Sequence, residues 1–270
     1  MEYKLTIKND QVTIDDSGKA KLTKTAGDLL ELKGLNTATT YDKSYSISLS
    51  QLEVTKEVYA PGYVKAWILV TKPEVTTNAD KATSTNNAAI SISEAKKFKN
   101  FLGHRISLTM DKEDIAKNYI IFDVQPQLQP DSNGNSCLHI LLHIYSPDYL
   151  LVLKKFSTCY TAKKIGEEII PDLLAKYAVK DTDNDVADAT GLFNYKADAD
   201  DLQQLSADLT YLTDKTLRAK TKEVEDKDGK KGTIKVVKKY ELIHPYLVQN
   251  DETAHDFISR TANRCGEFFF

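Results

Sequence analysis

Alternation of apolar and polar side chains dominates the first half of the chain. In residues 3–8, Tyr3, Leu5 and Ile7 fall on one face, and residues 45–49 and 63–70 repeat this pattern. Two further segments of the same kind follow at residues 106–110 and 119–124. Because successive side chains of a strand point to opposite faces, this period of two predicts β-strands. The first half is therefore predicted to be β-rich.

Residues 71–91 break this alternation. Thr, Asn, Ser and Asp dominate the segment, and no apolar period continues through it. We predict a long loop or a flexible insertion there. A short helix is predicted at residues 93–101, because Ser93 is a good N-cap and Ala95, Phe98 and Phe101 fall on one side.

The apolar segment at residues 137–145 fits two structures. On a helix, His139 and His143 stand at i and i+4 and could share a zinc ion. On a strand, both lie opposite an apolar face formed by every second residue. The hairpin-type turn at residues 132–135 and the period of two favour the strand. No Glu follows His139 to complete the metalloprotease motif, so the zinc hypothesis is the weaker one.

Residues 161–177 have the spacing of an amphipathic helix, capped by Thr161 and kinked at Pro171. An acidic segment follows. Asp181, Asp183 and Asp185 there resemble the start of a calcium loop, but the glycine and glutamate positions of such a loop hold other residues. We predict a solvated acidic loop without calcium.

A charged β-hairpin is predicted from residues 221–225 and 233–241, on either side of the turn at residues 226–232, and it is expected to project from the body. The last helix has the clearest pattern, an apolar stripe from Ala254 to Cys265. Thr253 and Asp256 form a capping-box-like start, and Gly266 is placed to end the helix. A strand of Phe residues then begins, which we interpret as the start of a domain that continues in a longer chain.

Length and composition narrow the class of protein. The chain has 270 residues, of which 28% are charged, with a net charge of -3. These values exclude a disordered chain, predict one large or two modest domains and provide no electrostatic reason to expect nucleic acid. No segment is long enough to cross a bilayer, no signal peptide is recognisable, and three cysteines form no disulfide pattern. A cytoplasmic origin is predicted.

Motifs that carry chemistry are not found. The sequence contains no nucleophile elbow, paired-cysteine, zinc or dinucleotide motif, and its five His residues are scattered. Cys159 is more typical of a structural thiol than of a nucleophile. The carboxylates lie in polar segments that predict solvated surfaces. We therefore predict no enzymatic activity, no catalytic residue, no cofactor and no metal.

The segment from His244 to Phe270 resembles the signature of the VgrG spike proteins of type VI secretion systems, which also marks the hub proteins of contractile-phage baseplates. The positions that fit are these: Tyr246, Val248, Gln249, Glu252, Phe257, Ser259, Arg260, Gly266 and Phe268. Asn250 departs from the signature, as do residues 262–265. Three weaker blocks at residues 101–108, 138–147 and 161–170 are similar to upstream family segments and occur in the family order.

This resemblance implies a mainly β fold with packed helices (α+β), built from barrel-like hub domains. It implies a first domain at residues 1–125, with a flexible insertion at about 71–91. The second, at residues 126–270, would hold the acidic loop and the projecting hairpin and would be an incomplete barrel.

The resemblance also implies a non-enzymatic homotrimeric hub that adapts a hexameric tail tube to a trimeric spike. Its implied partners are the tail-tube protein, baseplate proteins and a spike-tip protein or effector cargo, with no nucleic acid and no membrane insertion. The protein would be cytoplasmic during assembly and then ejected. The alternative is a β-rich binding or adhesive module without catalytic activity.

Overall fold

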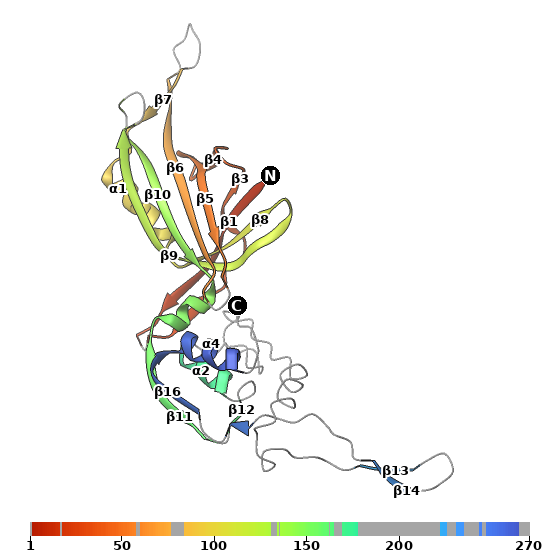
Figure 1. Cartoon of the computed structure of the whole chain (residues 1–270). Coiled ribbons are helices and arrows are strands. Elements are labelled where there is room, and N and C mark those ends of the chain that lie inside the picture. Colours follow the sequence, from red (N-terminus) through yellow and green to blue (C-terminus); the bar gives the residue numbers. More distant parts are fainter. Residues whose placement is uncertain are drawn as a thin grey trace. The chain divides into compact units, whose positions relative to one another are not determined.

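The computed structural model describes residues 2–16, 18–57, 60–76, 84–130, 134, 136–161, 163–164, 169–177, 222–225, 231–234, 243–244 and 247–264. The chain divides into two compact units, Met1–Tyr149 and Leu150–Phe269 (Figure 1). The predicted boundary lay at residues 125 and 126. The observed division falls later because β10, within residues 136–145, pairs along its length with two strands of the first unit.

The first unit is built on one antiparallel sheet of ten strands, in the order β2-β1-β8-β9-β10-β6-β5-β4, with β3 beside β1 and β7 beside β6 (Figure 1). Just past β3, Leu35 forms one isolated parallel bridge to Leu49 of β5. The strands are β1 Tyr3–Ile14, β2 Ala20–Thr23, β3 Asp28–Lys33, β4 Thr39–Tyr41, β5 Tyr45–Thr55, β6 Tyr63–Thr76, β7 Ser84–Ala88, β8 His104–Met110, β9 Glu113–Pro130 and β10 Ser136–Tyr145. The predicted mainly β class is confirmed, and so are the predicted strands at residues 3–8, 45–49, 63–70, 106–110, 119–124 and 137–145.

The core of the first unit follows the period of two in its sequence. In β10, every second side chain from Leu138 to Ile144 is buried, and in β6 the same holds from Val64 to Val70. The two strands are in register, with Leu138 opposite Val70 and Ile144 opposite Val64. Each pair therefore places two apolar side chains on the same face, which is how a sheet buries one side.

A short helical segment packs on this core. Helix α1 spans Ile92–Lys97, and the 3-10 helix η1 spans Phe98–Phe101. Its N-cap is Ser91 rather than the predicted Ser93, because Ser91 and Glu94 exchange the hydrogen bonds of a capping box. Phe98 and Phe101 are buried and contact the ring of Tyr41.

Glu94 links α1 to the sheet. Its carboxylate accepts hydrogen bonds from Lys72 Nζ at 2.8 Å, Tyr45 Oη at 3.2 Å and the Ser91 backbone N–H at 2.9 Å. These donors, Lys72 first, lower the pKa of Glu94 to about 2.

The insertion predicted at about 71–91 differs from the structure at both of its ends. Strand β6 continues to Thr76 and pairs with β7, in a register from Lys72 opposite Ala88 to Thr76 opposite Ser84. Residues 77–83 lie outside the described residues. Backbone hydrogen bonds extend a ladder whatever the side chains are, so a polar segment can form a strand without apolar periodicity.

The other face of β5, β6, β10 and β9 carries the side chains that alternate with the core, and we call it the outer face. It comprises Gln51, Glu53, Thr55, Tyr63, Lys65, Trp67, Leu69, Asp123, Gln125, Gln127, His139, Leu141, His143 and Tyr145.

The described part of the second unit contains small paired strands and two helices. These elements are β11 Lys155–Tyr160, β12 Lys163–Lys164, α2 Ile170–Tyr177, β13 Lys222–Glu225, β14 Lys231–Ile234, β15 Ile243–His244, β16 Leu247–Thr253 and α4 Ala254–Arg264, and the 3-10 helix η2, Pro147–Val152, precedes them. The antiparallel pairs are β11 with β16, β12 with β15 and β13 with β14. No described helix is both long and apolar enough to cross a membrane.

Two predictions for the second unit change with the structure. The helix predicted over residues 161–177 is shorter, because residues 163–164 form β12 and α2 begins at Ile170. Pro171 therefore stands in the first turn of α2, where its missing N–H costs nothing and it produces no kink. The predicted hairpin is present, but β14 spans Lys231–Ile234 instead of beginning at residue 233. The acidic loop, with Asp181, Asp183 and Asp185, lies outside the described residues.

Candidate functional site

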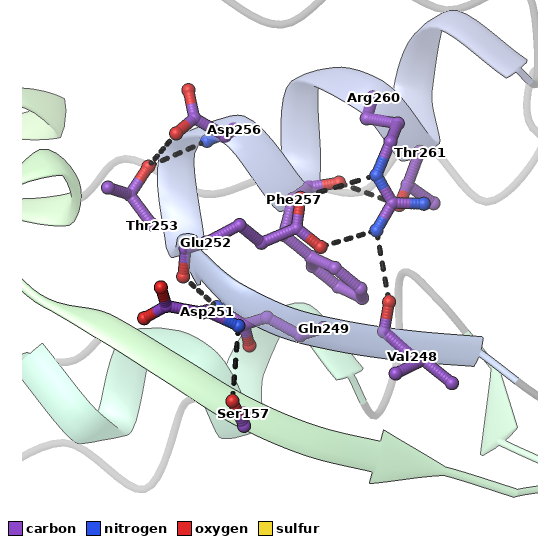
Figure 2. A network of polar contacts seen from close by, with 10 residues as sticks. All are labelled: Ser157, Val248, Gln249, Asp251, Glu252, Thr253, Asp256, Phe257, Arg260 and Thr261. Atoms are coloured by element: carbon purple, nitrogen blue, oxygen red, sulfur yellow. Dashed lines mark hydrogen bonds and ion pairs between the residues drawn. The ribbon is translucent and has the colours of Figure 1, made fainter.

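The residues that resemble the spike-protein signature are concentrated where β16 passes directly into α4. Strand β16 pairs with β11, with Val248 opposite Cys159 and Gln249 opposite Thr158. Asp251 has a positive φ of 46°, and its backbone N–H donates to Ser157 Oγ at 3.1 Å (Figure 2). This bond secures the turn of the chain to the neighbouring strand just before the helix begins.

Thr253 caps α4. Its Oγ1 accepts a hydrogen bond from the backbone N–H of Asp256 at 3.0 Å and donates to Asp256 Oδ2 at 2.7 Å. The acidic side chain in the first turn also interacts favourably with the helix dipole. The predicted capping-box-like start is confirmed. The helix begins at Ala254 because the cap satisfies one of its free N–H groups.

An ion pair joins the helix back to the strand. Arg260 Nη2 donates to Glu252 Oε1 at 2.5 Å, and its Nε donates to Oε2 at 3.3 Å, so the pair is bidentate (Figure 2). The same Nη2 donates to the backbone carbonyl of Val248 at 3.0 Å. Arg260 is one-third exposed and Glu252 one-fifth exposed. A planar guanidinium is the group that can satisfy a carboxylate and a carbonyl together.

The face of α4 that is turned to the interior is mostly apolar. Phe257 is 1% exposed, Ile258 is also buried, and the ring of Phe257 contacts that of Tyr160 with centroids 5.7 Å apart. The Arg260 guanidinium lies 5.4 Å from the Phe257 ring centroid. Thr261 is buried, and its hydroxyl donates to the Phe257 carbonyl at 2.7 Å. The stripe predicted from the sequence is buried at Ala254, Phe257, Ile258 and Thr261, and its last residue, Cys265, lies outside the described residues.

Gln249 is fully buried beneath this junction. Its Nε2 donates to the Glu252 carbonyl at 3.1 Å, which bridges the turn between strand and helix. Its Oε1 has no hydrogen-bond partner among the described residues.

Tyr177, at the end of α2, connects the junction to Lys154, the residue before β11. Its hydroxyl donates to the Lys154 carbonyl at 2.9 Å and accepts from the Ala254 N–H at 3.3 Å. Burial raises the pKa of Tyr177 to about 12, so the hydroxyl keeps its proton at neutral pH. Neither this role nor those of Ser157 and Asp251 could be predicted from the sequence, because their partners are distant along the chain.

Five of the nine signature residues take part in this cluster: Val248, Gln249, Glu252, Phe257 and Arg260. Ser259 lies on α4, but its buried hydroxyl has no hydrogen-bond partner among the described residues. Tyr246, Gly266 and Phe268 lie outside the described residues.

The polar contacts of the cluster hold strand β16 and helix α4 together. The hydrogen bonds of Arg260, Glu252, Thr253 and Asp256 are made to one another and to the backbone. None of these contacts pairs a nucleophile with a base in the way that covalent catalysis needs. Its effect is to fix the angle at which α4 leaves β16.

His139 and His143 lie on the outer face of β10, so the strand interpretation of this segment is confirmed. Residues four apart on a strand are about 13 Å apart, too far to share one ion. His143 Nδ1 is hydrogen-bonded to Tyr63 Oη at 2.5 Å. Within the described ranges, no group of three or more His, Cys, Asp or Glu residues could hold a metal ion.

Comparison with known proteins does not assign the chain to a family. No protein-family model matches it, and no curated protein matches its sequence.

Proposed function

We propose that this chain is the hub portion of a VgrG-type spike protein, a structural, non-enzymatic component of a contractile injection machine. The observation that carries the proposal is the β16–α4 junction. Signature positions chosen for their likeness to that family meet in one connected cluster, in which Glu252 and Arg260 form a bidentate pair.

The architecture of the first unit supports the proposal. A hub of this class needs barrel-like domains, and here six strands in the order β1-β8-β9-β10-β6-β5 wrap one continuous apolar core. The bridge between Leu35 and Leu49 links the segment after β3 to β5, while β3 pairs with β1 on its other side. We propose that this row of strands is the first hub barrel, and that the second unit belongs to a second, incomplete barrel.

The proposed mechanism is mechanical. Three chains would form a ring whose six barrel-like domains match a hexameric tail tube, with baseplate proteins outside and a spike-tip protein or effector below. The hub would assemble in the cytoplasm and leave with the spike when the sheath contracts. A junction such as β16–α4 suits this role, because a rigid strand-to-helix angle transmits force without a change of shape.

Light scattering tests the assembly. The purified protein is expected to have a mass of three times the 30.3 kDa of one chain and to bind a hexameric tail-tube protein. A full-length protein that is stable and strictly monomeric, with or without the tube protein, would count against the hub.

The second candidate is a β-rich adhesive or carbohydrate-binding module, which the Tyr-rich outer face favours. Its two tyrosines, Tyr63 and Tyr145, are however stacked, and Tyr149 of η2 stacks on Tyr145. Tyr63 and Tyr145 have centroids 4.5 Å apart, and Tyr145 and Tyr149 have centroids 4.0 Å apart. Ring faces that are already stacked are not free for a sugar. Binding to a glycan array without trimer formation would favour this module over the hub.

A further inference from the structure

We infer that the outer face of β5, β6, β10 and β9 is a contact surface for a second copy of this chain. The inference rests on the proposed trimeric hub and names the surface through which its subunits meet.

The centre of the outer face is apolar. Trp67 and Leu141 stand directly opposite each other in the register of β6 and β10, and Leu69 follows on the same side. All three are half-buried within the chain, although they point away from the core. Aromatic and aliphatic side chains at the centre of a face, rather than scattered singly, are typical of protein–protein interfaces.

Part of the margin of this centre is formed by three glutamines. Gln125 lies opposite Leu141 on β9, Gln127 lies opposite His139, and Gln51 flanks Trp67 on β5. These three glutamines are exposed. An apolar centre within a polar margin, where amides can exchange hydrogen bonds across the contact, is the usual organisation of a subunit interface.

Charge on the outer face is of both signs and nearly balanced. The charged side chains there are Glu53, Lys65 and Asp123, and Lys65 pairs with Glu53 at 3.8 Å. A strongly acidic or basic partner would find little to pair with. A nearly neutral protein surface is complementary, and this chain, with a net charge of only -3, can provide one.

The next copy can also provide apolar contacts. In a ring, each subunit presents two different surfaces to its neighbours. Ile14 and Leu102 are 55% and 47% exposed and lie off the outer face. Their segments are joined by the hydrogen bond from Val12 N–H to the Gly103 carbonyl at 2.7 Å. We assign these two side chains to the second surface of the subunit, which would contact the outer face of the neighbouring copy.

The area of the outer face reaches the lower limit for a specific contact. Four strands about 4.8 Å apart, over eight residues of about 3.3 Å each, cover roughly 500 Å². Two copies would then bury about 1,000 Å², which is near the lower limit for a specific interface.

The experiment measures the mass of the full chain by light scattering across a concentration series. Trp67→Glu and, separately, Leu102→Glu are expected to raise the concentration of half-assembly at least roughly tenfold, as the loss of a central interface side chain does. Ile92→Glu is the matched control, because Ile92 is 67% exposed in the same unit and belongs to neither set of side chains. It should leave assembly unchanged.

A second variant distinguishes loss of the contact from misfolding of the Trp67→Glu chain. Gln125→Arg combined with Gln127→Arg changes only exposed positions, and it should weaken assembly in the same way. A photo-crosslinker at position 141 should join two chains, and the joined peptide should contain Ile14 or Leu102. A wild-type protein that is monomeric throughout the series would overturn the inference, as would a crosslinker that joins no second chain.

The two proposals fail differently. If every variant remains a trimer, the outer face is not the subunit contact, while the trimeric hub stands. If the wild-type protein is monomeric but binds the tail-tube protein, the contact is refuted and the hub proposal is judged by tube binding alone.

Discussion

At the scale of single residues, Arg260 has the most partners in the candidate site. It donates to Glu252 and to the Val248 carbonyl and lies near the Phe257 ring. Removing its side chain would leave both a partly buried carboxylate and a carbonyl without their donor. Such losses cost more than the net value of the bond itself.

We therefore expect Arg260→Ala to lower the free energy of unfolding by about 1–2 kcal/mol. Arg260→Lys should recover only part of this loss, because an ammonium cannot form the bidentate contact. Urea titrations followed by circular dichroism measure the change. The matched control is Lys117→Ala, which breaks an exposed pair with Asp114 at 3.9 Å and should cost less than about 0.5 kcal/mol. Equal effects of the two substitutions would contradict the proposed role of Arg260.

The low pKa of Glu94 predicts that the stability of the folded chain depends on pH. Its pKa in the folded chain is about 2, below the ordinary value of 4.5, so its stabilising effect is complete above pH 4.5. This effect is lost as the pH falls from 4.5 towards 2, because over this range the carboxylate is protonated in the unfolded chain but still ionised in the folded one. Glu94→Gln should therefore destabilise the first unit at pH 7 but make much less difference at pH 2.5.

The single Trp of the chain, Trp67, lies in the first unit, so its fluorescence during urea unfolding measures this effect. Ser91→Ala is the comparison, because it removes the hydroxyl of the same cap and leaves the carboxylate in place. Because the Ser91 hydroxyl also donates to Glu94 Oε2 at 2.8 Å, part of its effect should be lost at low pH. The capping contribution of about 1 kcal/mol should remain at both pH values. A loss for Glu94→Gln that is equally large at pH 7 and pH 2.5 would contradict the linkage.

At the scale of elements, the connection from η1 to β8 depends on Gly103. Its φ is +81°, and a Cβ there would lie 2.4 Å from the Val12 carbonyl oxygen. Gly134 has the same φ of +81°, but a Cβ there would meet nothing within 4 Å. Comparing a substitution at each glycine therefore distinguishes the cost of a positive φ from the cost of steric overlap.

Gly134→Ala should cost about 1 kcal/mol, which is the penalty of a left-handed conformation alone. Gly103→Ala should cost at least about 2 kcal/mol more, because the Val12 backbone must move and its bond to the Gly103 carbonyl is disturbed. Urea unfolding followed by Trp67 fluorescence compares the two. If both variants lose the same stability, the close approach at Gly103 is not restrictive.

At the scale of the whole molecule, the first unit has its own core. Its buried cluster runs from Leu5 to Ile144 and is drawn from β1, β3, β5, β6, β8, β9, β10, α1 and η1. We expect residues 1–149 to fold alone and to unfold cooperatively in urea, with the same Trp67 fluorescence as in the full chain. Non-cooperative unfolding of this fragment would show that the unit depends on the rest of the chain.

Much of this fold could be predicted from the sequence because its signals are local. Alternation along residues 63–70 and 137–145 indicates which side chains are buried, since the period of a strand is independent of its partner. The cap formed by Thr253 and Asp256 spans four residues and was found for the same reason. Elements that lack apolar periodicity, such as β7, could not be found in this way.

By itself, the sequence determined the mainly β class, the buried faces of the strands and the start of the last helix, because each depends on neighbours along the chain. Only the tertiary structure decided where the first unit ends, since β10 joins it through pairing with β6 and β9. The tertiary structure also determined the hydrogen-bond partners of Arg260, Tyr177 and Asp251. Spacing along a chain sets the direction of a side chain, whereas pairing and packing bring distant groups within hydrogen-bond distance.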